Sequence, residues 1–413
     1  MPDIAFDHQD PAFVADPYPV LRRLQETAPV FRSERMGAWV VTRHADVRAA
    51  FRDPRLSSDR IRPFVAQLQP ALKELVLPLG ENLALWAVFN DPPQHTRLRA
   101  LMSKAFTSRA VESLKPRIAA IVDELLDGME AKRGDSDSRG LDYHREFAYP
   151  LPATVIAELL GVPRPDVEKL KKWSDDLAQF VLTSRANPEK YRRAAAGMAE
   201  MTDYFDHFIR RRAAEGGGSD VTAALLAARE RDDRLSHDEI VATALLLLFA
   251  GHETTTQLLA NGMYWLLRQP AARDEFGAHL DDQRYVENAV EEMLRYDGPS
   301  LSMVRVAAQD FEWHGQRIGK GERVFLFMSA ANRDPRVFAD PDRFDLGRAN
   351  AGEHLTFGYG IHFCTGAPLA RLEGQIAFPR VLRRFPRLAL ADSNPPWSDS
   401  ILTRGMLEMR VRI

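Results

Sequence analysis

Residues 357–366 read FGYGIHFCTG, and Cys364 in this stretch is the only cysteine of the 413-residue chain. Gly358 and Gly360 allow the backbone to fold back and to approach a flat or bulky group closely. From Leu369 onward the sequence has a helical pattern, so Cys364 lies where a glycine-rich loop enters a helix. Unpaired backbone N–H groups and the positive end of the helix dipole favour a thiolate at such a position.

A thiolate serves proteins mainly as a nucleophile or as a metal ligand. One cysteine cannot form a Cys₄ zinc or iron–sulfur site, but it can be the single protein ligand of a haem iron. As a nucleophile it needs a base within reach, and His362 is the nearest candidate in the sequence. A buried structural cysteine is the third interpretation, and the pattern FGxGxHxCxG followed by LARLE is too specific for it.

Composition and charge exclude several classes of protein. The chain is 45 % hydrophobic and 27 % charged, with a net charge of −3, so nothing indicates a nucleic-acid partner. The N-terminus has neither a basic region nor an apolar run, and the longest apolar run, 241–250, is too short to span a bilayer. A lone cysteine excludes an intramolecular disulfide. We therefore expect a cytoplasmic protein without a membrane anchor.

The pattern of the chain predicts one mainly α domain. Ser236 and Glu239 have the spacing of a capping box, which predicts a helix from there to about Arg268. At about 1.5 Å per residue this central helix is roughly 50 Å long. Residues 53–90 contain several prolines without steady periodicity, and no element is predicted there. Short strands are predicted at 30–31, 39–42, 304–306, 311–313 and 324–326.

The central helix contains the sequence AGHETTT at 250–256, in which an acid, Glu253, is followed by an alcohol, Thr254. Glycine and threonine lower helix propensity, and a threonine hydroxyl that bonds a backbone carbonyl bends a helix. A distorted helix with an acid and an alcohol can hold a small ligand and pass protons to it. The alternative is a polar patch on a solvated helix face, which the apolar residues just before it disfavour.

Residues 357–373 resemble the haem-binding loop of cytochrome P450 monooxygenases, and the resemblance extends over nearly the whole chain. It implies a mainly α, cytochrome P450-like fold in a single domain, 1–413, with a small β-rich region and a long central helix. It also implies haem b on Cys364 and O₂ as co-substrate. On the same resemblance, Glu253 and Thr254 are the pair that delivers protons, whereas His252 is assigned no role.

The resemblance further implies which side chains hold the haem. His95 and Arg99 lie four residues apart on one helix face, and charge-assisted hydrogen bonds from such donors suit two propionates. A buried triad beneath the haem is matched by Glu292, Arg295 and Arg343, with a structural role. The full set of expected haem-binding residues is His95, Arg99, Ala250, Arg305, Phe357, His362, Cys364 and Gly366, with Cys364 as the iron ligand.

These features predict a haem-thiolate monooxygenase that hydroxylates or epoxidises a lipophilic small molecule. The chain has no flavin or iron–sulfur signature, so electrons must come from a ferredoxin or flavodoxin with its NAD(P)H-dependent reductase. Arg371 is a candidate contact for that donor. The expected substrate-lining residues are Trp86, Val88, Leu246, Phe249, Leu301, Met303 and Leu402.

Three alternative functions stay open at this point. A haem sensor or carrier has no need of an acid–alcohol pair, and a peroxide-driven peroxygenase resembles this chain but usually lacks that pair. A cysteine hydrolase would bind no haem, so an absorption spectrum would distinguish it.

Overall fold

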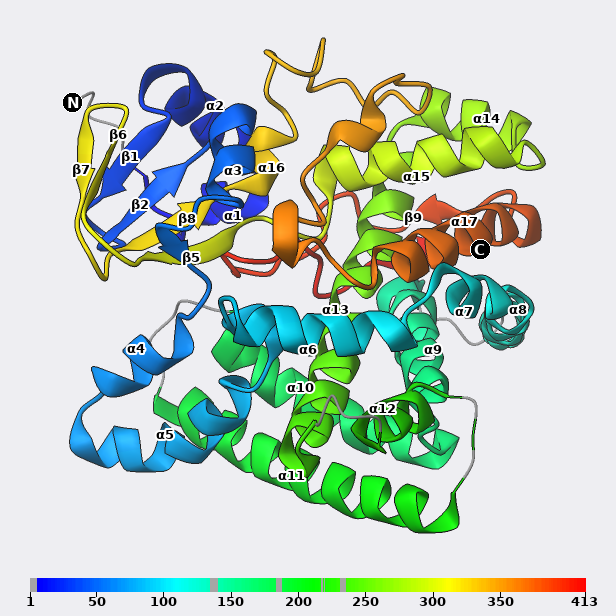
Figure 1. Ribbon diagram of the computed structural model, residues 1–413. Coiled ribbons are helices and arrows are strands. Elements are labelled where there is room, and N and C mark those ends of the chain that lie inside the picture. Colours follow the sequence, from blue (N-terminus) through cyan, green and yellow to red (C-terminus); the bar gives the residue numbers. More distant parts are fainter. Residues whose placement is uncertain (1–5, 134–139, 183–187, 217, 219, 231–234) are drawn as a thin grey trace.

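Helices form most of the computed structural model, which describes residues 6–413 except 134–139, 183–187, 217, 219 and 231–234 (Figure 1). Before the central helix lie α1 Pro11–Ala15, α2 Tyr18–Thr27, α3 His44–Ala50, α4 Ile61–Ala66, α5 Pro70–Leu83, α6 Gln94–Ala105, α7 Ser108–Ser113, α8 Lys115–Ala131, α9 Pro150–Leu160, α10 Val167–Val181, α11 Pro188–Glu215 and α12 Val221–Glu230. From there on lie α13 His237–Arg268, α14 Pro270–Ala278, α15 Gln283–Asp297, α16 Met328–Ala331 and α17 Ala367–Arg384. Short 3₁₀ or π turns are η1 Ala87–Phe89, η2 His144–Ala148, η3 Arg164–Asp166, η4 Ala351–Glu353 and η5 Gly360–His362.

The central helix α13 is the predicted one, and the other helices pack around it (Figure 1). Its capping box is complete, because the Ser236 hydroxyl accepts from the Glu239 N–H at 3.1 Å while the Glu239 carboxylate accepts from the Ser236 N–H at 2.9 Å. Most of α13 is buried. Gly251 lets α9 approach, since a Cβ there would lie 2.7 Å from Cγ1 of Ile156.

The β-rich region joins distant parts of the chain and lies beside the helices (Figure 1). Its main sheet has the order β1-β2-β8-β5-β3, and β2 runs parallel to β8 while the other pairs are antiparallel. One apolar cluster packs on each side of this sheet. The strands are β1 Val30–Ser33, β2 Ala38–Val41, β3 Leu56–Ser57, β4 Leu141–Asp142, β5 Met303–Ala307, β6 Phe311–Trp313, β7 Gln316–Ile318, β8 Arg323–Leu326, β9 Ala389–Leu390 and β10 Arg410–Arg412.

Residues 53–90, for which the sequence predicted no element, contain the helices α4 and α5. Val76, Leu79 and Leu83 are buried on one face of α5, which packs against α11. That spacing is helical, but Pro78 interrupts the pattern because proline cannot donate its backbone hydrogen bond. Packing of the apolar face therefore outweighs the missing bond.

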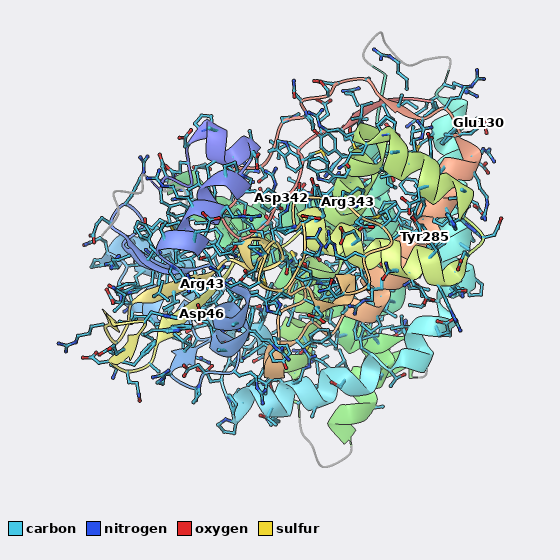
Figure 2. The ribbon with its side chains drawn as sticks, turned by 90° about the horizontal axis from the view of Figure 1, so that it is seen from above. Arg43, Asp46, Glu130, Tyr285, Asp342 and Arg343 are labelled. Atoms are coloured by element: carbon cyan, nitrogen blue, oxygen red, sulfur yellow. The ribbon has the colours of Figure 1, made fainter. Side chains whose placement is uncertain are left out.

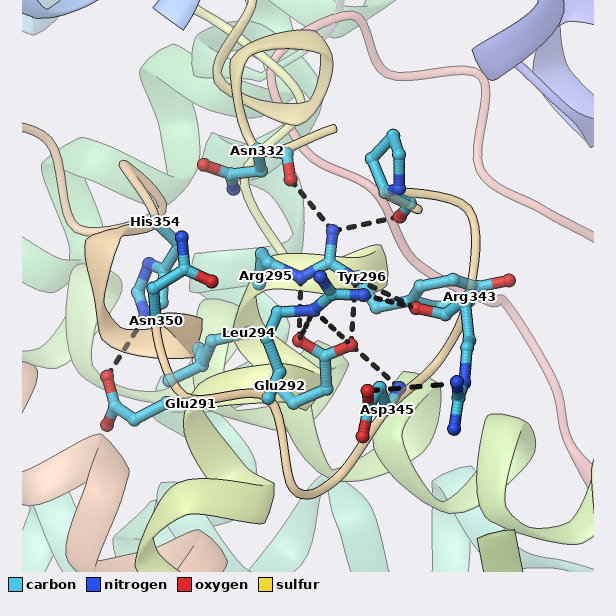
Figure 3. Close-up of polar contacts among 12 residues, drawn as sticks. Glu291, Glu292, Leu294, Arg295, Tyr296, Asn332, Arg343, Asp345, Asn350 and His354 are labelled. Atoms are coloured by element: carbon cyan, nitrogen blue, oxygen red, sulfur yellow. Dashed lines mark hydrogen bonds and ion pairs between the residues drawn. The ribbon is translucent and has the colours of Figure 1, made fainter. Parts of the chain in front are cut away.

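A buried ion triad joins α15 to the long segment after α16 (Figure 3). Glu292 has no exposed surface, and its carboxylate accepts hydrogen bonds from Arg295 at 2.6 and 2.8 Å. The third member of the triad is Arg348, whose Nε lies 3.2 Å from a Glu292 oxygen. Both guanidiniums also donate to backbone carbonyl groups of the segment, which ties it to α15.

The prediction of Arg343 as the third member is wrong. Its side chain is 71 % exposed and lies 4.0 Å from Asp345, and it neighbours Asp342 in the view from above (Figures 2 and 3). Only its backbone carbonyl takes part, by accepting from Arg295 and Arg348. Both arginines lie on one irregular segment, so only its folded path decides which side chain turns inward.

Candidate active site around Cys364

The loop before Cys364 has a conformation that requires its glycines. Gly358 and Gly360 have φ angles of +72° and +74°, in the left-handed region where a side chain is strained. The Cys364 N–H donates to the Phe357 carbonyl at 2.9 Å and so closes the loop. A Cβ on Gly360 would lie 3.1 Å from the side chain of Arg52, so the glycine lets the loop lie close to the end of α3.

The sulfur of Cys364 lies at the N-terminus of α17, as predicted. Burial raises the pKa of its thiol, whereas hydrogen bonds from the N–H groups of Gly366 and Ala367 and the charge of Arg99 lower it. Burial dominates, so the loop alone does not favour the thiolate, contrary to our expectation. The residue keeps exposed surface although protein surrounds it, so it borders open interior space. A metal ion bound there would remove the thiol proton.

Basic side chains from four separate segments gather beside this loop. The rings of His95, on α6, and His362 lie with their centroids 4.0 Å apart. Arg99, one turn after His95, donates to the Phe363 carbonyl at 2.5 Å. Burial, followed by the charge of Arg99 and more weakly that of Arg305, on β5, lowers the pKa of His95. Burial and then the charge of Arg305 lower the pKa of His362 to about 3.

Arg60 belongs to the same group, although no pattern in the sequence pointed to it. Burial, followed by the charge of Arg305, lowers the Arg60 pKa to about 10, and its guanidinium lies over the Phe89 ring at 4.9 Å. Among the described residues no carboxylate pairs with it. Arg305 is 4 % exposed and donates only to the carbonyl of Val304.

These cations fit a ligand that carries carboxylates. The His95 Nδ1 atom is buried without a hydrogen-bond partner. The nearby carboxylate of Asp91 already accepts from the Ser57 hydroxyl and the Ser58 N–H. A buried, uncompensated cation costs several kcal/mol. Two haem propionates beside a cysteine ligand would supply the missing negative charge, so the residues present fit a haem.

The predicted proton-delivery pair lies on α13, which runs unbroken through this segment. The Thr254 hydroxyl donates to the Ala250 carbonyl at 3.3 Å, as expected, but no break in the helix follows. Ala250 is exposed although the preceding turns are buried, so this face of α13 borders open space. The Glu253 side chain is 21 % exposed, and its Oε1 lies 3.3 Å from Nε2 of His252.

The structure divides the predicted substrate-lining residues into two groups. In the first, the rings of Trp86 and Phe249 lie 5.5 Å apart, and Trp86 is only 1 % exposed because its indole N–H donates to Asn82. Trp86 therefore supports the wall rather than offering surface to a ligand. In the second group, the Leu301 N–H donates to the Leu402 carbonyl at 2.9 Å. Leu246 belongs to the apolar core between the helices, against which Val88 packs, and Met303 packs on the sheet.

Arg371, the predicted donor contact, is engaged within the protein. Its guanidinium donates twice to Glu291, at 2.6 and 2.8 Å, and lies 4.6 Å from the Phe357 ring centre. Its side chain is 28 % exposed. The charge of Arg371 is therefore neutralised inside the fold.

Comparison with known proteins identifies the family. The family model described as Cytochrome P450 matches residues 40–404. The chain belongs to the cytochrome P450 family. The predicted family and P450 fold are thus confirmed; the enzyme is a P450 monooxygenase, an oxidoreductase with the family's haem.

The similarity covers almost the full length of several relatives. Cytochrome P450 monooxygenase PikC of Streptomyces venezuelae is 40 % identical, over 97 % of this chain and 92 % of that protein. Vitamin D(3) 25-hydroxylase of Pseudonocardia autotrophica is 37 % identical, over 97 % and 94 %. The crystal structure of P450BioI in complex with an acyl carrier protein ligated to hexadec-9Z-enoic acid superposes with a TM-score of 0.87 at 33 % identity, over 97 % and 99 %. Among the described residues of this P450, no helix is long and apolar enough to cross a membrane.

Proposed function

We propose that this P450 inserts one oxygen atom of O₂ into a lipophilic small molecule, by hydroxylation or epoxidation, in the cytoplasm. The observation that carries the proposal is a group of arginines beside Cys364, of which Arg305 is buried and Arg60 and Arg99 are half-buried. Within the described part of the chain, none of the three pairs with a carboxylate. When bound, haem b supplies the activation of O₂ that protein side chains cannot provide. The protein binds and orients the substrate, and it excludes water from the site.

Each basic residue has a defined part in holding haem b. Cys364 supplies the sulfur ligand, and a thiolate pushes electron density toward the iron. Arg60, Arg99 and Arg305 donate charge-assisted hydrogen bonds to the propionates, which are the stronger kind. His95 directs its unpaired Nδ1 to the same groups.

Glu253 and Thr254 hold and move the protons that the reaction consumes. The Thr254 hydroxyl, now bonded to the Ala250 carbonyl at 3.3 Å, can turn to donate toward the open space beside α13. The Glu253 carboxylate takes protons from the other side of the helix and renews the proton that Thr254 passes on. This is a general-acid role.

The substrate is a large apolar molecule. The lining groups around Phe249 and Leu301 are hydrocarbon surfaces, which favour a fatty acyl chain, a steroid-like ring system or a polyketide. The names of the relatives, which include a vitamin D(3) hydroxylase and a complex with an acyl carrier protein, support this class.

An acidic ferredoxin or flavodoxin, with its NAD(P)H-dependent reductase, delivers electrons at the outer face of the Cys364 loop. Arg48 and Arg52 are exposed there beside Tyr359, and Ile361 is 53 % exposed. An apolar residue among cations suits a transient, charge-steered contact. These residues replace Arg371 as the expected contacts, because Glu291 already neutralises Arg371.

The test is a screen of lipophilic compounds for a shift of the haem spectrum, followed by turnover with a ferredoxin, its reductase and NAD(P)H. Oxygenated product that requires all three components supports the proposal. Product formed only with added hydrogen peroxide indicates a peroxygenase. Spectral shifts without product in either assay indicate a haem carrier. The peroxygenase result and the carrier result would each overturn the proposal.

A further inference from the structure

His252, which was assigned no role from the sequence, has one nitrogen available for proton exchange. The residue is 2 % exposed, and its Nδ1 lies 2.8 Å from the Leu248 carbonyl one turn earlier on α13. A carbonyl oxygen only accepts, so Nδ1 carries a hydrogen and Nε2 is the site that gains or loses a proton. Nε2 has no hydrogen-bond partner of good geometry, yet it lies 3.3 Å from Oε1 of Glu253.

A small cavity lies against this imidazole, between α9, α10 and α13. Its volume of about 10 Å³ gives room for the centre of a single water molecule. His252, Tyr149, Ser174 and Lys171 contribute its polar lining. The Tyr149 hydroxyl and the Ser174 hydroxyl are, like Nε2, buried without hydrogen-bond partners. A water molecule bound in a space of this size would satisfy these three unpaired polar atoms.

The surroundings of this cavity are charged and closely packed. The Lys171 ammonium lies 4.0 Å from the centre of the Tyr149 ring. The centres of the Tyr149 and His252 rings lie 5.6 Å apart. Burial opposes a charge on His252, but its contact with Glu253 raises the His252 pKa above the usual value. Partial desolvation by the neighbouring protein, and then the charge of Glu253, raise the pKa of Asp175 to about 6, although the residue still reaches solvent.

The other titratable groups that face this cluster are accounted for. On α10, Asp176 is paired with Arg193, and Glu168 acts only weakly on Tyr149. His144, on η2, has a pKa lowered by burial, so it is neutral. Among the described residues, Asp175 is the exposed acid whose charge acts on His252.

We propose that His252 is the positioning residue that supplies protons to Glu253 from the water cavity behind α13. The inference rests on the proposed monooxygenase function. A proton from the cavity water binds Nε2 and makes an imidazolium, and solvent replaces that proton by way of Asp175. The imidazolium then transfers the proton to Oε1 of Glu253 and returns to the neutral ring. No electrons move in this step.

The chain offers a matched control in His207, on α11. Its Nδ1 also lies 2.8 Å from the carbonyl four residues earlier, and 3.3 Å from the carboxylate of Asp203, but its side chain is 74 % exposed. His252→Gln keeps a polar group of similar reach that carries no exchangeable charge. His207→Gln makes the same change on the surface, away from the cavity.

The first measurement follows histidine ring nitrogens by NMR in the ferrous carbon monoxide form, which requires no turnover. The His252 resonance is assigned as the one that is missing in His252→Gln. In wild type it is expected to titrate above pH 6.5, and in Glu253→Gln, where the partner charge is gone, it is expected to titrate below pH 6.5. An ordinary pKa, or one that Glu253→Gln leaves unchanged, would overturn the inference. This result stands even if no substrate is ever oxidised, which separates it from the proposed function.

The second measurement is the pH dependence of coupled turnover. Wild type is expected to slow as the pH rises past the His252 pKa, whereas His252→Gln is about 10²-fold slower and loses that inflection. His207→Gln should match wild type. An unchanged pH profile in His252→Gln, even with a raised pKa in the first measurement, would make the pair a static contact and refute the relay.

Discussion

Replacement of Arg348 by alanine tests the corrected ion triad. Arg348 is 7 % exposed, lies 3.2 Å from Glu292 and donates to the carbonyls of Ala339, Asp340 and Arg343. The substitution removes the side-chain donor of the Ala339 carbonyl, takes one of two donors from the carbonyls of Asp340 and Arg343, and leaves Glu292 with a single arginine partner. Breaking a buried ion pair costs about 3–5 kcal/mol.

That cost can be converted into a melting temperature. An unfolding entropy of about 2.1 cal/mol/K per residue gives about 0.9 kcal/mol/K for 413 residues. A loss of 3–5 kcal/mol therefore lowers Tm by about 3–6 °C. Since the segment that carries Arg348 leads into the Cys364 loop, haem content per protein should fall as well.

The assay is calorimetry of purified holoprotein, with the pyridine haemochrome as the measure of bound haem. Arg343→Ala is the control, because it removes an exposed side chain but keeps the carbonyl that the triad uses. Its effect should stay within about 0.5 kcal/mol. Equal Tm losses in the two variants, or a larger loss in Arg343→Ala, would refute this assignment of the triad.

Three further predictions concern the proton pair, the electron donor and acid stability. Thr254→Ala should keep substrate binding and NAD(P)H consumption but release hydrogen peroxide in place of product. Glu253→Gln should slow the whole cycle by about 10²-fold or more, with better coupling than Thr254→Ala. Equal coupling in Thr254→Ala and wild type would contradict this. Pure protein with NAD(P)H and O₂ alone should not turn over, and Arg52→Glu should raise KM for the donor without changing Tm; sustained turnover without a donor would exclude a separate partner. Burial opposes the ionised Glu291, but hydrogen bonds from Arg371 and His354 outweigh it and hold the Glu291 pKa at about 2. This stabilisation is complete above the unfolded pKa of about 4.3 and is lost as the pH falls toward 2, so Glu291→Gln should flatten the pH dependence of Tm in that window; an unchanged slope would show that the pairing contributes nothing.

Local patterns in the sequence predicted local structure well. The capping box at Ser236 predicted the start of α13, and the glycines around Cys364 predicted a folded-back loop before a helix. In both cases the deciding interactions lie within a few residues of one another.

The sequence did not predict contacts that depend on the path of the whole chain. Nothing marks Arg348 rather than Arg343 for the triad, and nothing distinguishes Arg60 from a surface arginine. His252 looked replaceable because its cavity is built by α9 and α10, which are distant in sequence. Long-range packing selects these side chains.

The carbon monoxide difference spectrum of the reduced protein tests the central claim, that Cys364 is the thiolate ligand of a haem. Wild type is expected to bind haem and to show the red-shifted Soret band of a thiolate-ligated iron. Cys364→Ser should lose that band, because the chain has no other cysteine. A wild-type protein that binds no haem, or a variant that keeps the band, would contradict the account.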